Sequence, residues 1–131
     1  AVHWLAVPIA LTIFNVIFIN EFPDYEADRT YGKRNMVVRW GLAASSKVYG
    51  VVSWAAAVAT FVAVWAVGWP RGAYAIVAAP AFLAALNGAR VWDGHYRDPR
   101  RLENICGVGI IINLLITAAF VVNVLLYGVP F

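Results

Sequence analysis

The sequence has little charge, almost no cysteine and no tract of low complexity. Charged residues make up 13% of the 131 residues, whereas 63% are hydrophobic and the mean hydropathy is +0.73. Soluble globular domains carry about 25% charged residues, so this composition excludes an ordinary soluble domain and indicates a membrane protein. Cys106 is the single cysteine, which excludes an intrachain disulfide.

Four apolar stretches are long enough to cross a bilayer, which takes roughly 20 residues of helix. They cover residues 1–20, 48–69, 73–91 and 105–127. We therefore predict an all-α fold: a polytopic membrane helical bundle with about four transmembrane helices. Long polar loops at residues 21–47 and 92–104 and a tight turn at Gly-Trp-Pro-Arg-Gly join the helices.

The basic residues lie almost entirely in or beside the two long loops. Nine of the ten Lys and Arg residues are there, and Arg71 is the exception. By the positive-inside rule the two loops are cytoplasmic and both chain ends face outward, in a protein of the cell (inner) membrane. We expect these residues to set topology and to contact anionic lipid headgroups of the bilayer, and we expect no nucleic-acid partner.

An acidic cluster follows the first apolar stretch directly. Eight consecutive residues hold four of the seven carboxylates of the chain, namely Glu21, Asp24, Glu26 and Asp28. On a helix, Asp24 and Asp28 share a face, and Asn20 and Glu21 extend it by a turn. The D-x-x-x-D spacing is also common on solvated helices, but ionisable residues beside a membrane span are candidates for function.

The residues after this cluster favour a phosphate site held by a metal ion. Mg²⁺ is usually bound by one or two carboxylates together with substrate phosphates, so Asp24 and Asp28 are candidate ligands. Lys33 and Arg34 carry the ammonium and guanidinium groups that bind phosphate oxygens. Gly32 allows the chain to turn back toward the acidic face.

Residues 20–41, NEFPDYEADRTYGKRNMVVRWG, resemble the second aspartate-rich motif of the UbiA-type intramembrane prenyltransferases. In that motif an Asn precedes D-x-x-x-D, which is followed by Gly-Lys-Arg and a short apolar-basic run that ends in Gly. The stretch from Gly32 to Gly41 is most similar to the branch that prenylates dihydroxynaphthoate in menaquinone biosynthesis. The hydropathy of the chain resembles the second half of this nine-helix fold. The resemblance therefore implies that residues 1–131 are the C-terminal part of one such domain.

The resemblance implies an enzyme that transfers an isoprenyl group from a prenyl diphosphate to an aromatic quinone precursor, with Mg²⁺ as cofactor. It implies that Asp24 and Asp28 are metal ligands and that Lys33 acts with them in catalysis. It further implies that four residues bind the diphosphate: Lys33, Arg34, Arg39 and Asn20. The membrane helices would enclose the prenyl tail. Naphthoate, hydroxybenzoate, homogentisate, chlorophyllide and glycerol-lipid acceptors are all compatible with the motif.

The first aspartate-rich motif of the family, N-D-x-x-D-x-x-x-D, has no counterpart in these residues. We expect the N-terminal half of the fold, with that motif, to lie upstream in the native reading frame or on a partner chain. The alternative from a different class is a non-catalytic membrane module or transporter fragment whose acidic loop binds a cation or a partner. The presence of the first aspartate-rich motif upstream would favour the enzyme.

Overall fold

The computed structural model of the chain describes residues 2–129, which contain helices and no strand. The elements are α1 (His3–Asn20), α2 (Tyr25–Thr30), α3 (Met36–Val67), α4 (Arg71–Trp92), the 3-10 helix η1 (His95–Arg97) and α5 (Pro99–Tyr127). The four long helices are each long and apolar enough to cross a membrane. The predicted all-α fold with about four transmembrane helices is confirmed. Residue 1, where the first predicted span begins, lies outside the described residues.

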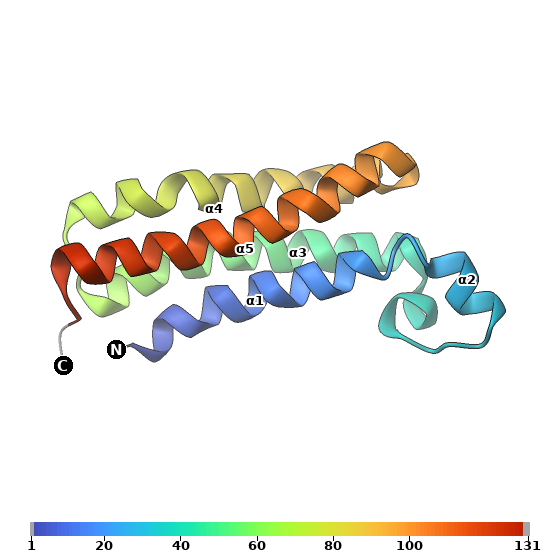
Figure 1. Cartoon of the computed structure of the whole chain (residues 1–131), viewed down its shortest axis with the longest axis horizontal. Coiled ribbons are helices and arrows are strands. Elements are labelled where there is room, and N and C mark those ends of the chain that lie inside the picture. The colour runs from blue at the N-terminus through green and yellow to red at the C-terminus, as the bar shows by residue number, and fades with distance from the viewer. Residues whose placement is uncertain (1, 130–131) are drawn as a thin grey trace.

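The long helices lie side by side as a bundle in which successive long helices run in opposite directions (Figure 1). α3 packs against α1 and α4, and α5 packs against the same two helices from the other side. Buried apolar side chains form two clusters. One includes Val64 and Ile116, and the other includes Phe18, Val37 and Ile105 and lies toward the end that carries α2.

α3 begins inside the segment that the sequence analysis assigned to a loop, at Met36 rather than at residue 48. Asn35 caps its first turn, because the side-chain oxygen accepts a hydrogen bond from the backbone N–H of Val38 at 2.8 Å. Gly41 then interrupts the helix with φ 79° and ψ 161°, so residues 36–40 form a short separate turn. Hydropathy misses this turn because its length and its basic residue are unlike those of a membrane span.

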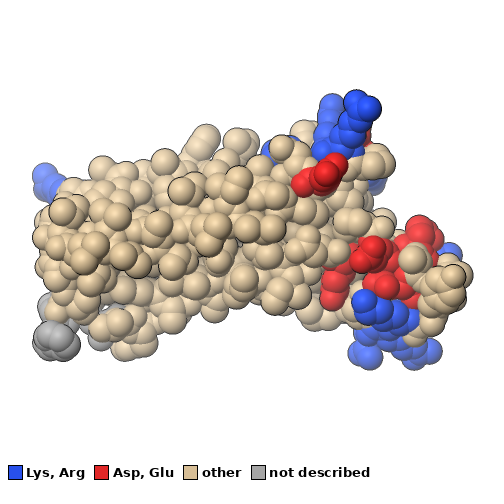
Figure 2. All heavy atoms as spheres, in the orientation of Figure 1, with Lys and Arg blue, Asp and Glu red and all other residues tan. Residues whose placement is uncertain are grey.

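Charged side chains gather at one end of the bundle, around α2 and the connection between α4 and α5 (Figure 2). The long sides are apolar, and large side chains such as Val58 and Leu125 are 63% and 79% exposed on them. Such a surface suits contact with lipid. Arg71, the first residue of α4, lies at the opposite end. The cytoplasmic placement of the charged end stays a prediction from the basic loops.

A layer of polar side chains crosses the interior of the bundle. The amide nitrogen of Asn15 donates to the backbone oxygen of Tyr49 at 3.2 Å and to the hydroxyl of Ser53 at 2.8 Å. The amide nitrogen of Asn87 donates to the hydroxyl of Tyr49 at 2.9 Å and to the backbone oxygen of Ile105 at 3.3 Å. Polar groups at membrane depth need partners inside the protein. These bonds link all four long helices.

Candidate active site

The acidic cluster lies at the turn between α1 and α2, and not on one continuous helix. α1 ends at Asn20, and residues 21–24 form the turn before α2 begins at Tyr25. Pro23 accounts for the break, since it has no backbone N–H and disfavours helical geometry at Phe22 before it. The expected stripe from Asn20 through Glu21 to Asp28 is therefore wrong in its first part.

Asp24 and Asp28 keep the relation that their spacing predicts. Asp24 is the N-cap residue of α2, and the backbone N–H of Asp28 donates to the backbone oxygen of Asp24 at 2.8 Å. The two residues are thus one helical turn apart. Asp24 is exposed, whereas only 14% of the Asp28 side chain is exposed. No group of three His, Cys, Asp or Glu side chains suited to a metal ion occurs in residues 2–129.

The chain turns back toward Asp28 at Gly32, as the sequence indicated. Gly32 has φ 76°, and the backbone N–H of Lys33 donates to the backbone oxygen of Asp28 at 2.8 Å. The ammonium nitrogen of Lys33 then lies 3.4 Å from Oδ2 of Asp28, the one salt bridge found in residues 2–129. Because 62% of the Lys33 side chain is exposed, this ion pair contributes little stability.

Asn35 is a site residue that was not among the candidates predicted from the sequence motif. Its amide nitrogen donates to Oδ2 of Asp28 at 3.0 Å. Its oxygen accepts the capping bond from Val38 described above. A sequence signal was present, because Asn immediately before the apolar run Met-Val-Val is a typical helix N-cap. The contact with Asp28, seven residues earlier, has no sequence signal of its own.

The other candidate residues lie apart from this cluster. Arg34 and Arg39 line a shallow hollow of about 530 Å³ together with Val38. Asn20 lines a different hollow, of about 580 Å³, between the α1–α2 turn and the beginning of α5, where Arg97 and Glu103 also lie. Of the six candidates, Asp24, Asp28 and Lys33 are therefore brought together, and the remaining three border neighbouring surfaces.

Arg29, the one cation of α2, interacts with its own helix. Interaction with the Tyr25 side chain, and next the charge of Glu26, raise the pKa of the Arg29 guanidinium above its ordinary value. Arg29 stays charged at any physiological pH. The ion pair of Asp28 is with Lys33 and not with Arg29.

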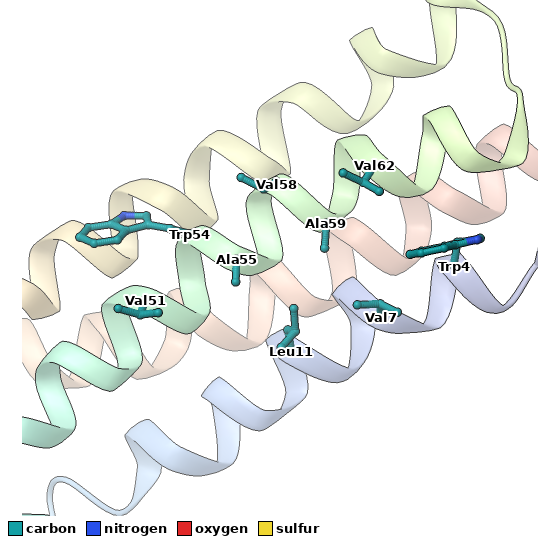
Figure 3. A pocket seen from close by; sticks show the side chains of 9 residues that line it. All are labelled: Trp4, Val7, Leu11, Val51, Trp54, Ala55, Val58, Ala59 and Val62. Atoms are coloured by element: carbon teal, nitrogen blue, oxygen red, sulfur yellow. The ribbon is translucent and has the colours of Figure 1, made fainter.

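An apolar groove runs between α1 and α3 on the side of the bundle (Figure 3). Its volume is about 620 Å³, and nine side chains line it: Trp4, Val7, Leu11, Val51, Trp54, Ala55, Val58, Ala59 and Val62. The groove lies along the apolar length of the bundle and offers no charged group to a ligand. It can accept a hydrocarbon chain and has no means of binding a phosphate.

Comparison with known proteins assigns the chain to a family. The sequence model of the UbiA prenyltransferase family matches residues 1–105 of the 131. This range contains Asp24, Asp28, Lys33, Arg34 and Arg39. No curated protein and no solved structure gives a significant match. With four helices able to span a bilayer and this match over most of its length, the chain is an integral membrane protein that belongs to the UbiA prenyltransferase family.

Proposed function

We propose that the protein transfers an isoprenyl group from a prenyl diphosphate to an aromatic quinone precursor, such as dihydroxynaphthoate, in a Mg²⁺-dependent reaction within the membrane. Family membership supports the general reaction class. The observation that carries the finer proposal is the arrangement at the charged end, where Asp24 and Asp28 are one turn apart and Lys33 contacts Asp28. The acceptor is proposed from the resemblance of residues 32–41 to the menaquinone branch.

Asp24 and Asp28 are the proposed Mg²⁺ ligands. Their carboxylates are the hard oxygen donors that Mg²⁺ takes, and the described residues add no third acidic, His or Cys side chain. Two carboxylates suit an ion that is shared with substrate phosphates, and they are too few for a site built by protein alone. Bound there, Mg²⁺ supplies positive charge that stabilises the diphosphate as it leaves.

Lys33, Arg34 and Arg39 are the proposed contacts of the diphosphate. The exposed Lys33 side chain is held by one weak ion pair, so its ammonium group can leave Asp28 for a phosphate oxygen. Arg34 and Arg39 line one hollow, and guanidinium groups match phosphate oxygens in geometry. Asn20 borders the adjoining hollow and is proposed as a lesser contact.

The allylic carbon must be kept from water once the diphosphate departs, and the apolar length of the bundle serves this purpose. We assign the prenyl tail to the hydrocarbon side of the site, with the groove between α1 and α3 as one apolar wall. Desolvation also strengthens the attraction between the cations and the developing charge on the diphosphate. The first aspartate-rich motif is proposed to come from a preceding segment or a partner chain.

The test is substitution of the two carboxylates in the full-length protein. Asp24→Ala and Asp28→Ala should each lower Mg²⁺-dependent transfer of a labelled prenyl group to dihydroxynaphthoate by about 100-fold or more, since each removes charge that acts in the transition state. Thermal unfolding in detergent should show that both variants remain folded.

Glu26→Ala is the matched control, because Glu26 is an exposed carboxylate of the same short helix. It should leave transfer within about twofold of the wild-type rate, as most exposed substitutions are nearly neutral. Full activity in both aspartate variants would refute the assignment of Asp24 and Asp28 as metal ligands. Absence of transfer by the folded wild-type protein would refute the enzyme and favour a non-catalytic module. Transfer to hydroxybenzoate in preference to dihydroxynaphthoate would refute only the menaquinone branch.

A further inference from the structure

The side chain of Asn35 joins the acidic helix to the beginning of α3. Its amide nitrogen donates to Oδ2 of Asp28 at 3.0 Å, while its amide oxygen accepts from the backbone N–H of Val38 at 2.8 Å. Asn35 has φ −73° and ψ 174°, the extended geometry of an N-cap residue. Because both ends of one planar amide are engaged, the capping bond fixes where the donor points.

We propose that Asn35 is a positioning residue for Asp28. It holds Oδ2 against the first turn of α3 and thereby leaves Oδ1 as the oxygen that is presented to a ligand. This role rests on the proposed function, in which Asp28 binds Mg²⁺. Hydrogen-bond partners behind a metal-binding carboxylate commonly fix its orientation, and their loss weakens metal binding.

Lys33 is less suited to this role although it contacts the same oxygen. Its nitrogen is 3.4 Å from Oδ2, and 62% of the side chain is exposed, so the ammonium group is free to exchange partners. Asn35 is half-buried, and its capping bond immobilises it. Asn35 therefore remains hydrogen-bonded to Asp28, whereas Lys33 can move to the substrate.

The competing interpretation is that Asn35 only caps α3, and two substitutions separate the roles. Serine is an equally good N-cap residue, but its side chain ends one atom too early to supply a donor where the Asn35 nitrogen lies. Asn35→Ser therefore keeps the cap and loses the contact with Asp28. Asn35→Ala loses both. Asp98→Ala is the control, because it removes a helix cap that is not in contact with Asp28. Oδ1 of Asp98 accepts hydrogen bonds from the backbone N–H groups of Arg100 and Arg101 at 2.9 and 3.2 Å, at the beginning of α5.

The measurement is the Mg²⁺ concentration that gives half-maximal prenyl transfer by the full-length protein, together with the thermal midpoint. Asn35→Ser should raise the required Mg²⁺ concentration by about tenfold or more with a midpoint near that of the wild type. Asp98→Ala should lower the midpoint by a few degrees and leave the Mg²⁺ requirement unchanged. An unaltered Mg²⁺ requirement in Asn35→Ser would overturn the proposal.

A second readout does not depend on the reaction. Mn²⁺ bound to the protein without substrate is measured by electron paramagnetic resonance, and Asp28→Ala identifies the portion held by Asp28. If the wild type transfers no prenyl group but binds Mn²⁺ through Asp28, and Asn35→Ser binds it about tenfold more weakly, the proposed function fails while the positioning role stands. Equal Mn²⁺ affinity in the wild type and Asn35→Ser, or no Mn²⁺ bound through Asp28, would overturn the positioning role.

Discussion

The contact between α3 and α4 leaves no room for a side chain at Gly88. A methyl group added there would lie 2.5 Å from Cβ of Ser53 and 3.3 Å from the backbone oxygen of Gly50. Carbon atoms in contact are normally 3.5–4.0 Å apart, so the deficit is about 1 Å. Cβ of Ser53 is fixed by its own backbone, and no rotation of that side chain relieves the overlap. Gly88→Ala must therefore push the two helices apart.

The expected loss of stability follows from three contributions. Overpacking costs about 1–3 kcal/mol, and we expect a value in the upper half of this range because the neighbouring atom cannot rotate away. Separation of the helices also strains the hydrogen bond from Asn15 to Ser53, and such bonds contribute about 0.6 kcal/mol in membrane proteins. The higher helix propensity of alanine offsets about 1 kcal/mol. The net loss is about 2 kcal/mol, or roughly 30-fold in the folded-to-unfolded ratio.

The assay is equilibrium unfolding of the full-length protein in mixed detergent micelles, followed by tryptophan fluorescence. Gly107→Ala is the matched control, because Gly107 is an exposed residue of α5 and no atom lies within 4 Å of the added methyl group. That variant should be unchanged or more stable by up to about 1 kcal/mol. Equal stability of Gly88→Ala and the wild type would refute the close approach of α3 and α4.

Two further substitutions have expected outcomes in the same unfolding assay. Gly41→Ala should destabilise the protein by about 1–3 kcal/mol although its methyl group meets no atom within 4 Å, because φ 79° with ψ 161° is open essentially to glycine alone; an unchanged midpoint would contradict this backbone geometry. Asn15→Leu should cost at most about 1.7 kcal/mol, less than Gly88→Ala, since it removes hydrogen bonds and keeps the branching and the number of non-hydrogen atoms of the side chain. A larger loss for Asn15→Leu would mean that the polar layer outweighs helix packing.

The four membrane helices could be predicted from the sequence, since each depends on a property that a run of residues carries by itself. Mean hydropathy over about 20 residues does not require any knowledge of the neighbouring helices. The polar end was harder, because α2 and residues 36–40 are too short for a periodic signal. Their limits are set by Pro23, Asn35 and Gly41, single residues whose effect depends on local backbone geometry.

The sequence predicted which residues belong to the candidate site better than it predicted how they are arranged in space. The return of Lys33 to Asp28 was expected from Gly32, and the structure confirms it. The positions of Arg34 and Asn20 in separate hollows depend on where α1 ends and how α3 is oriented. Spacing along the chain carries no such information, because Asn20 would have joined the acidic face only if α1 had continued past it.

The two apolar clusters of the core have different consequences for function. The cluster around Val64 and Ile116 lies in the part of the bundle remote from α2, so loosening it should lower stability and leave the Asp28 contacts in place. The other cluster contains Phe22 of the acidic turn and Val37 of the first turn of α3, both almost completely buried. These two residues flank the segment that carries both proposed metal ligands and Asn35. The geometry of the charged end is therefore fixed mainly by the packing of Phe22 and Val37 against apolar side chains of α1 and α5, and less by the few polar contacts of that end.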